Sequence, residues 1–383
     1  MSQHQPVFFV APDGDDANCG SQTEPWRTIQ HAANLLRAGA TVLIRGGVYC
    51  ERVIPRNSGA PGQPIRYAAF PGEQVTIDGA GIELPAYTPV TPRPPLPGHD
   101  WPGAYIGHPR QLGGLFHLEG VAHIEVRGVR VINAGPHRDN AGILLKDCHN
   151  IVVADAVTYN TTSSGIGVWR CHRITITGNT VELACNDGGQ ECITIAGVDA
   201  FEVAHNHVHH SGPGSEGGEG IDVKHGSSRG RVHHNHIEHI NRLGIYVEAW
   251  DTLTRTIEID QNLVHHNAKD GITVASEAGG LLKDVHIHDN VVFGNGHSGF
   301  VVGRYGDVDH QPIRGVMVAG NRFFDNGRRG VGGGVWIENP ECEGIVIRAN
   351  QLWRNRQFEL ALRDDVPSAA VTIEENDIHE GKE

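Results

Sequence analysis

Asparagine recurs through the second half of this chain at a nearly constant spacing. Neighbouring copies stand 26 to 31 residues apart, at Asn179, Asn206, Asn235, Asn262, Asn290, Asn321, Asn350 and Asn376. An apolar residue stands three positions before each copy and another stands two positions after it. Such a period indicates a repeat architecture, in which a unit buries its apolar face only against its neighbours.

A third apolar segment completes each repeat. It reads "GILL" from 142, "GIGV" from 165, "CITI" from 192, "GIDV" from 220, "GIYV" from 244, "GITV" from 271, "GFVV" from 299 and "GVWI" from 334. Alternating apolar residues predict strands with one buried face, and 50 glycines favour a turn-rich β protein. We therefore predict an all-β, single-stranded right-handed parallel β-helix over residues 41–383, with three short strands per coil and consecutive coils over 114–379. The asparagines are predicted to form an internal hydrogen-bonded ladder.

Two segments do not follow the repeat: the N-terminal 40 residues and an insertion at 82–113. Residues 1–40 predict an N-terminal strand and a capping helix over 26–38, with Thr23 as its cap and Gly39 after its end. The helix would cover the open edge of the first coil. A proline-rich insertion at 82–113 interrupts the repeat as either an irregular loop or a wall over a cleft. Tyr87, Trp101 and Tyr105 favour the wall, because aromatic rings stack on sugar faces.

The opening "VAPDGDDANCGSQTEPWRTIQHAANLLRAGATVLIRGGVY", followed by these coils, resembles the pectate-lyase-like superfamily, in particular bacterial β-helix proteins similar to family 9 polysaccharide lyases. In that superfamily the asparagine ladder lies between the second and third strands, and substrate binds along the first strand. The resemblance thus implies that the "GI-x-V" strands form the binding sheet. The segments 184–190, 211–219, 249–255 and 303–315 would wall it, and such variable loops commonly carry function.

One copy of the strand differs from the others. Stacking the outward positions of the "GI-x-V" strands puts Asp222 and Lys224 beside Tyr246 and Glu248 of the next coil. We expect these four side chains to form one outward patch, with small threonines and alanines beside it. The alternative interpretation is a surface ion pair between Lys224 and Glu248, which stabilises by only about 0 to 1 kcal/mol and needs no function.

The resemblance implies a polysaccharide lyase that cleaves a uronic-acid-containing glycan by β-elimination, with Lys224 as the base. Carboxylates around an amine raise its pKa, so this reading requires a bound cation. A calcium ion is expected, with oxygen ligands. The expected calcium ligands are Asp187, Glu216, Glu219 and Asp222. The expected substrate-binding residues are Arg304, Trp250, Asp251, His225, Glu277 and Tyr305.

Two other functions remain open. A glycoside hydrolase could use Asp222 and Glu248, because retaining and inverting enzymes place two carboxyl groups about 5 to 9.5 Å apart. A non-catalytic glycan-binding β-helix would instead lack a cleft and would lock the Lys224 amine in a closed ion pair.

Charge and cysteine content limit the partners. A net charge of −14 argues against nucleic acid, and no apolar run reaches the 18 residues expected of a membrane span. The expected partner is a carbohydrate, an anionic one included. An odd count of seven cysteines and the lack of an export signal indicate a cytoplasmic protein, or a secreted one if a signal was removed. Cys148 and Cys171 are predicted to stack as buried thiols.

Histidines also fall into columns, of which His205 with His234 and His207 with His236 are two. Repetition alone stacks identical side chains, so the sequence favours a structural role there. A zinc or copper site is the alternative.

Overall fold

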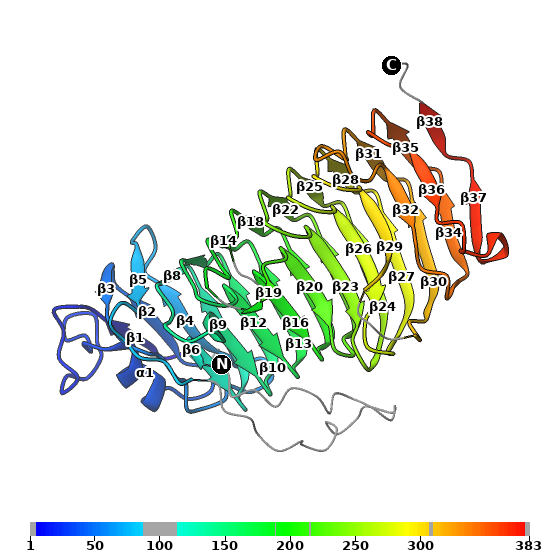
Figure 1. Cartoon of the computed structure of the whole chain (residues 1–383). Helices are drawn as coiled ribbons and strands as arrows, with labels where there is room; N and C mark the ends of the chain where they lie inside the picture. The colour runs from blue at the N-terminus through cyan, green and yellow to red at the C-terminus, as the bar shows by residue number, and fades with distance from the viewer. Residues whose placement is uncertain (1–4, 87–112, 188, 214–215, 306–308, 380–383) are drawn as a thin grey trace.

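The chain winds as a long parallel β-solenoid, drawn from the N-terminal end to the C-terminal end in Figure 1. This computed structural model describes residues 5–86, 113–187, 189–213, 216–305 and 309–379. Within these residues the strands form three long sheets, here named A, B and C, and one short pair. The expected aromatic wall residues Tyr87, Trp101 and Tyr105 lie outside the described residues.

Sheet A contains β1 (Val7–Val10), β2 (Thr41–Ile44), β4 (Ile65–Ala69), β7 (Ala122–Arg127), β10 (His149–Ala154), β13 (His172–Thr177), β17 (Asp199–Ala204), β21 (Ser228–His233), β24 (Leu253–Asp260), β27 (Leu281–His288), β30 (Ile313–Ala319), β33 (Cys342–Glu343), β34 (Ile345–Arg348) and β37 (Val371–Glu374).

Sheet B contains β3 (Gly47–Tyr49), β5 (Val75–Asp78), β8 (Val129–Ile132), β11 (Val157–Tyr159), β14 (Thr180–Glu182), β18 (His207–His209), β22 (His236–Glu238), β25 (Leu263–His265), β28 (Val291–Phe293), β31 (Arg322–Phe324), β35 (Gln351–Trp353) and β38 (Asp377–His379).

Sheet C contains β6 (Gly113–Glu119), β9 (Asn140–Lys146), β12 (Ile166–Trp169), β16 (Ile193–Ala196), β20 (Ile221–Lys224), β23 (Ile245–Ala249), β26 (Ile272–Ser276), β29 (Phe300–Arg304), β32 (Val335–Ile337) and β36 (Leu360–Leu362). The short pair is β15 (Gly189–Gln190) with β19 (Glu216–Gly217), and the helical elements are α1 (Ile29–Leu35) and the 3₁₀ turn η1 (Ser368–Ala370).

The predicted asparagine ladder is confirmed at the bend between sheets A and B. From Asn179 to Asn376, each amide nitrogen donates to the side-chain oxygen of the next copy at 2.9 to 3.0 Å. The residue before each asparagine has a positive φ, for example 57° at His205 and 52° at His234. This left-handed residue turns the chain sharply inward, and the ladder satisfies the buried polar groups of that bend.

A second ladder follows the first by five residues and was not predicted. Asn267, Asn295, Asn326 and Asn355 bond to one another at 2.9 to 3.0 Å. The signal was present in the sequence, because these residues repeat with the same period. The second ladder lies at the bend between sheets B and C.

The helix α1 caps the core as predicted, but the predicted bounds were wrong. It spans Ile29–Leu35, and Thr28 rather than Thr23 caps it by accepting from the His31 N–H. The Glu51 carboxylate also accepts the N–H groups of Ile29 and Gln30, a distant contact that local sequence does not reveal. Ahead of it, β1 pairs with β2, so sheet A already begins within residues 1–40.

The buried thiols are confirmed. The Cys148 N–H lies 3.3 Å from the Cys171 sulfur, and both cysteines are free. In the part of the chain that the structure describes, no helix has the length and apolar character needed to span a bilayer.

Candidate functional site

The predicted outward patch is assembled on sheet C. Thr194, Asp222, Tyr246 and Thr273 pair in one row across β16, β20, β23 and β26. Ala196 pairs with Lys224 in the next outward row. The alternate residues Val223 and Val247 are fully buried in the core, which places the polar residues on the opposite, outer face. The predicted register is therefore correct.

The Lys224 amine lies within a closed ion pair, which is one of the two signs expected above of a non-catalytic glycan-binding β-helix. Its Nζ lies 2.5 Å from Glu191 Oε1 and 3.3 Å from Asp222 Oδ2. Thr194 donates to the other oxygen of Glu191 at 2.8 Å and so fixes that carboxylate. The expected alternative, a surface ion pair with Glu248, is wrong, because the amine turns toward the preceding coil and is only 8% exposed.

Carboxyl groups outnumber cations around Lys224, in a group of side chains that we call the cluster: Glu191, Glu219, Asp222, Lys224, Arg242 and Glu248. Glu191, Glu219, Asp222 and Glu248 are each no more than 5% exposed. The nearby cations are Lys224 and Arg242, whose Nε lies 2.7 Å from Glu219 Oε1. Among the described residues, Asp222 Oδ1 and Glu248 Oε2 are buried without a hydrogen-bond partner. A buried oxygen without a hydrogen-bond partner destabilises the folded state. These two oxygens therefore require a proton or a bound cation.

Burial and crowding shift the pKa values in the cluster. Burial raises the pKa of Asp222 and of Glu248 well above the usual range, and neighbouring carboxylates add to the effect. Burial alone would lower the pKa of the Lys224 amine. The charges of Glu191, Asp222 and Glu248 together outweigh burial, and the pKa of Lys224 is raised. The objection foreseen from the sequence therefore holds in the structure.

Tyr246 belongs to an adjoining group rather than to the ion pair. Its hydroxyl donates to Glu277 Oε1, and its ring meets the Tyr305 ring edge-on at 6.1 Å. Burial, with Glu248 and Glu277 nearby, raises the pKa of Tyr246 well above the usual range. Of the expected substrate-binding residues, Glu277 and Tyr305 thus lie together on the C-terminal side of the cluster.

Aromatic rings border the cluster at the end of the strands. The buried His225 ring lies 6.2 Å from the Trp169 ring and 6.3 Å from the Trp250 ring. Trp250 and Asp251 follow β23 and are exposed. Arg304 is exposed at the end of β29, three strands along sheet C from Lys224, or about 14 Å away along the axis.

The predicted calcium ligands do not converge. Glu219 and Asp222 lie in the cluster, but Asp187 is exposed and lines a separate cavity of about 450 Å³ with Asn160 and Asn186. The reason is local, because the Asn186 amide donates to Asn160 Oδ1 at 2.7 Å and holds this segment at the bend between sheets B and C. The side chain of Glu216 lies outside the described part of the chain.

Comparison with known proteins agrees with the observed fold. A family model described as "Pel9A-like, right handed beta helix region" matches residues 8–307, and a general right-handed β-helix model matches residues 258–383. The chain belongs to the Pel9A-like β-helix family.

Two relatives and one solved structure illustrate the family. The uncharacterized protein YwoF of Bacillus subtilis (strain 168) is 27% identical over 393 residues, covering 97% of this chain and 80% of YwoF. Pectate lyase PEL9 of Emericella nidulans is 30% identical over 160 residues, covering 41% of this chain and 34% of that protein. The crystal structure of pectate lyase Pel9A has a TM-score of 0.53 and 14% identity, covering all of this chain and 79% of that one, which shows a common fold.

Within this Pel9A-like chain, sequence reasoning missed the role of Glu191 and did not identify Arg242. A signal for Glu191 existed, since Glu191 and Glu219 hold equivalent positions two residues before consecutive strands of sheet C. That spacing places both acids beside the patch, but it does not show that Glu191 is the partner of the Lys224 amine. Arg242 lies in a loop and has no such periodic signal.

Proposed function

We propose that this protein cleaves a uronic-acid-containing glycan by β-elimination on the outer face of sheet C, with Lys224 as the base and calcium as the cofactor. The observation that carries the proposal is the buried Lys224 in contact with Glu191 and Asp222, in a group of four buried carboxyl groups on that face. Membership of a family whose relatives include proteins named pectate lyase supports the same reaction.

In this reaction the Lys224 amine removes the proton at C5 of the uronic acid. The C–H electron pair becomes the C4–C5 double bond while the C4–O4 bond breaks, and the departing oxygen takes a proton from water. Glu191 and Asp222 hold the amine in position through their ion pairs. Trp250, after β23, and Tyr305, after β29, offer ring surfaces for neighbouring sugars.

The residues fit a calcium ion by their chemistry. Asp222 Oδ1 and Glu248 Oε2 are hard oxygen donors that lack other partners among the described residues. Calcium held by these two residues would supply positive charge against the substrate carboxylate and against the surrounding acids. Once the carboxylate charge is offset, burial dominates the Lys224 environment, and burial lowers the pKa of an amine toward that of a usable base.

A glycoside hydrolase is the second candidate, favoured by one observation. Burial raises the pKa of Glu248 well above the usual range, as a general acid requires near neutral pH. Asp222 would then act as the partner carboxylate, and Lys224 would only hold charge in balance.

A substrate panel separates these functions. The protein is stripped with EDTA and then assayed on polygalacturonate, alginate and neutral glycans after addition of either calcium or zinc. We expect unsaturated uronides, detected by ultraviolet absorbance, only on a polyuronate and only with calcium. New reducing ends without that absorbance would identify the hydrolase. Glycan binding without any cleavage would refute both enzyme assignments.

A further inference from the structure

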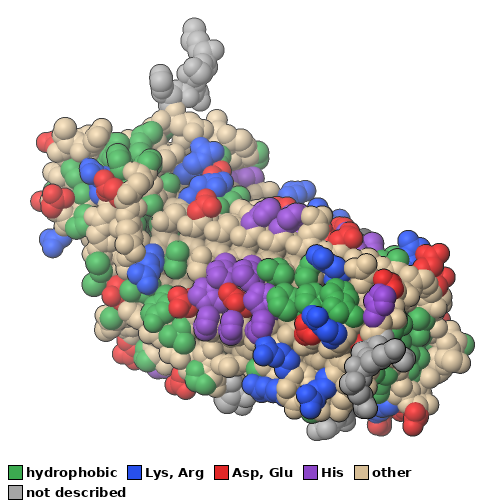
Figure 2. Space-filling model, turned by 90° about the horizontal axis from the view of Figure 1, so that it is seen from above, with side chains coloured by type: hydrophobic (Ala, Val, Ile, Leu, Met, Phe, Trp, Pro, Cys, Tyr) green, Lys and Arg blue, Asp and Glu red, His purple; other side chains and the backbone are tan. Residues whose placement is uncertain are grey.

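Histidine side chains gather on one face of the solenoid, beside a hydrophobic group (Figure 2). Among the described residues, three groups each bring three ligand atoms within 4.8 Å of one another: His205, His233 and His234; His207, His236 and Glu238; and Glu258, His286 and His288. None of these groups belongs to sheet C, so the proposed lyase reaction does not use them.

The group on sheet B offers the best donor set, with His207 on β18 and both His236 and Glu238 on β22. His207 Nε2 lies 3.1 Å from Glu238 Oε1, and His236 Nε2 lies 3.7 Å from the same oxygen. His265 on β25 adds a fourth donor, because its Nε2 lies 2.9 Å from His236 Nε2. Three consecutive strands therefore present three imidazole nitrogens and one carboxylate oxygen.

We propose that His207, His236, Glu238 and His265 bind one divalent transition-metal ion of the zinc class. Zinc binds such ligands tetrahedrally at about 2.0 to 2.2 Å, which places neighbouring donor atoms roughly 3.3 to 3.6 Å apart. The separations of 3.1 and 3.7 Å within the group of His207, His236 and Glu238 bracket that range. His265, which lies outside the group whose ligand atoms are all within 4.8 Å of one another, must move closer to serve as the fourth ligand.

The surrounding contacts orient these donors. His239 Nδ1 lies 3.0 Å from Glu238 Oε2, which leaves Oε1 toward the imidazoles. His266 bonds to His265 Nδ1 at 2.8 Å, and the His265 ring stacks on Phe293 at 4.7 Å. Outer partners of this kind fix the tautomer and the ring orientation of metal-ligating histidines.

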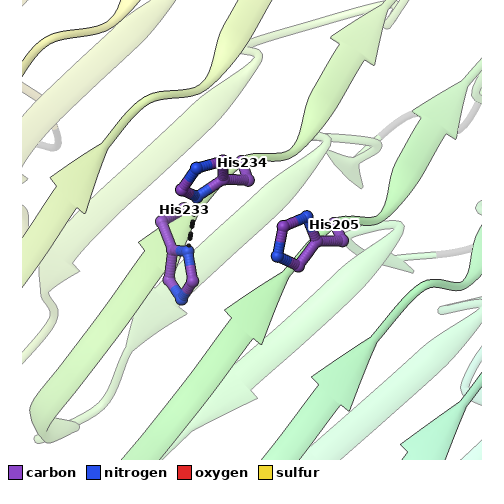
Figure 3. Close-up of side chains that lie close together, drawn as sticks. All are labelled: His205, His233 and His234. Atoms are coloured by element: carbon purple, nitrogen blue, oxygen red, sulfur yellow. Dashed lines mark hydrogen bonds between the residues drawn. The ribbon is translucent and has the colours of Figure 1, made fainter.

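The neighbouring histidine group lacks this arrangement. In Figure 3 the His233 and His234 rings turn toward each other, with 2.8 Å between their Nδ1 atoms, while His205 lies alongside. A similar close pair joins His265 and His266. The group of His205, His233 and His234 differs in that its three ligand atoms are all imidazole nitrogens, with the Glu202 carboxylate 3.0 Å from His233 Nε2 but outside the group. It therefore serves as an internal comparison.

The test uses the full chain, stripped of metal and titrated with Zn²⁺, and with Co²⁺ as a spectroscopic probe. We expect one Zn²⁺ equivalent that binds more tightly than any other, and the intense visible absorption of tetrahedral Co²⁺. Glu238→Gln and His236→Ala should each weaken this equivalent by at least about 100-fold, since even outer partners of a ligand contribute 10- to 100-fold. His286→Ala and His205→Ala, in the other two groups, should leave it unchanged.

Circular dichroism checks that each variant is folded. If only one of Glu238→Gln and His236→Ala folds, that variant alone still tests the proposal. Equal weakening by all four substitutions would mean that Zn²⁺ adsorbs to surface histidines in general. That result, or a Co²⁺ spectrum without the tetrahedral bands, overturns the proposal.

Discussion

Lys146 and Lys224 occupy the same outward column of sheet C, yet their surroundings differ. Lys146 on β9 pairs with Glu119 at 2.7 Å, and that carboxylate is 43% exposed. Lys224 on β20 pairs with Glu191 and Asp222, whose side chains are 6% and 2% exposed. In the first pair the lysine is buried but its single carboxylate partner is exposed to solvent, whereas the second lysine is part of a buried excess of negative charge.

The difference between the two lysines arises from the residues that stand just before the strands of sheet C. The position two residues before each strand core holds Ala141 and Ser164 near Lys146, but Glu191 and Glu219 near Lys224. The same scaffold position therefore becomes a candidate site only where this flanking column turns acidic. The lysine by itself does not mark the site.

The strongest test of the comparison removes each lysine in turn. Lys224→Ala should lower turnover on the active polyuronate by about 10² to 10⁴, because general-base catalysis is lost. Lys146→Ala, which removes a matched ion pair, should change turnover by less than about threefold. Initial rates at saturating calcium give both values. Comparable losses in the two variants would mean that Lys224 has only the structural role of Lys146.

Asp270 stands two residues before β26, in the same column as Glu191 and Glu219. Its pKa offers a test of how strongly burial acts on carboxyl groups in this column. Burial raises the pKa of Asp270 from 3.8 to about 6, so the folded protein holds this proton more tightly than the unfolded chain. Stability from this group is full below about pH 4 and is lost as pH rises through 6. Asp270→Asn should therefore gain on the order of 3 kcal/mol relative to the natural protein across that window. Urea unfolding at both pH values measures this, and a constant difference would contradict it.

The asparagine ladder supports the coil of Lys224. On the coil of Lys146 the equivalent position holds Ala156, which has no side-chain amide and takes part only through its backbone N–H, a donor to Asn179 Oδ1. Asn235→Ala removes the acceptor of the buried Asn206 N–H, at a cost of about 1 to 3 kcal/mol. Asn376→Ala, at the half-buried end of the ladder, should cost less. Chemical unfolding of both variants gives the order, and the reverse order would show that the ladder does not stabilise the central coils.

The features that could be predicted from the sequence are those set by equivalent strand positions in consecutive coils. Side chains in a parallel coil stack with the period of the repeat, so the fold, the ladder and the row of Asp222 and Tyr246 follow from sequence spacing. Contacts outside the strands do not follow, because loops close over different lengths. The displaced Asp187 and the helix start fixed by Glu51 are both of this kind.

The smallest expected effect concerns Glu248, which has no counterpart beside Lys146. Glu248→Gln keeps the shape but removes one buried charge and one proposed calcium ligand. A lyase should then need more calcium, with roughly tenfold lower activity at limiting calcium and near-normal turnover at saturation, since Lys224 still removes the proton. A hydrolase that uses this carboxyl as its acid would lose nearly all activity at every calcium concentration, because an amide cannot donate that proton. Calcium titrations of both proteins separate the outcomes, and a loss that calcium does not restore would assign the reacting group to Glu248 instead of Lys224.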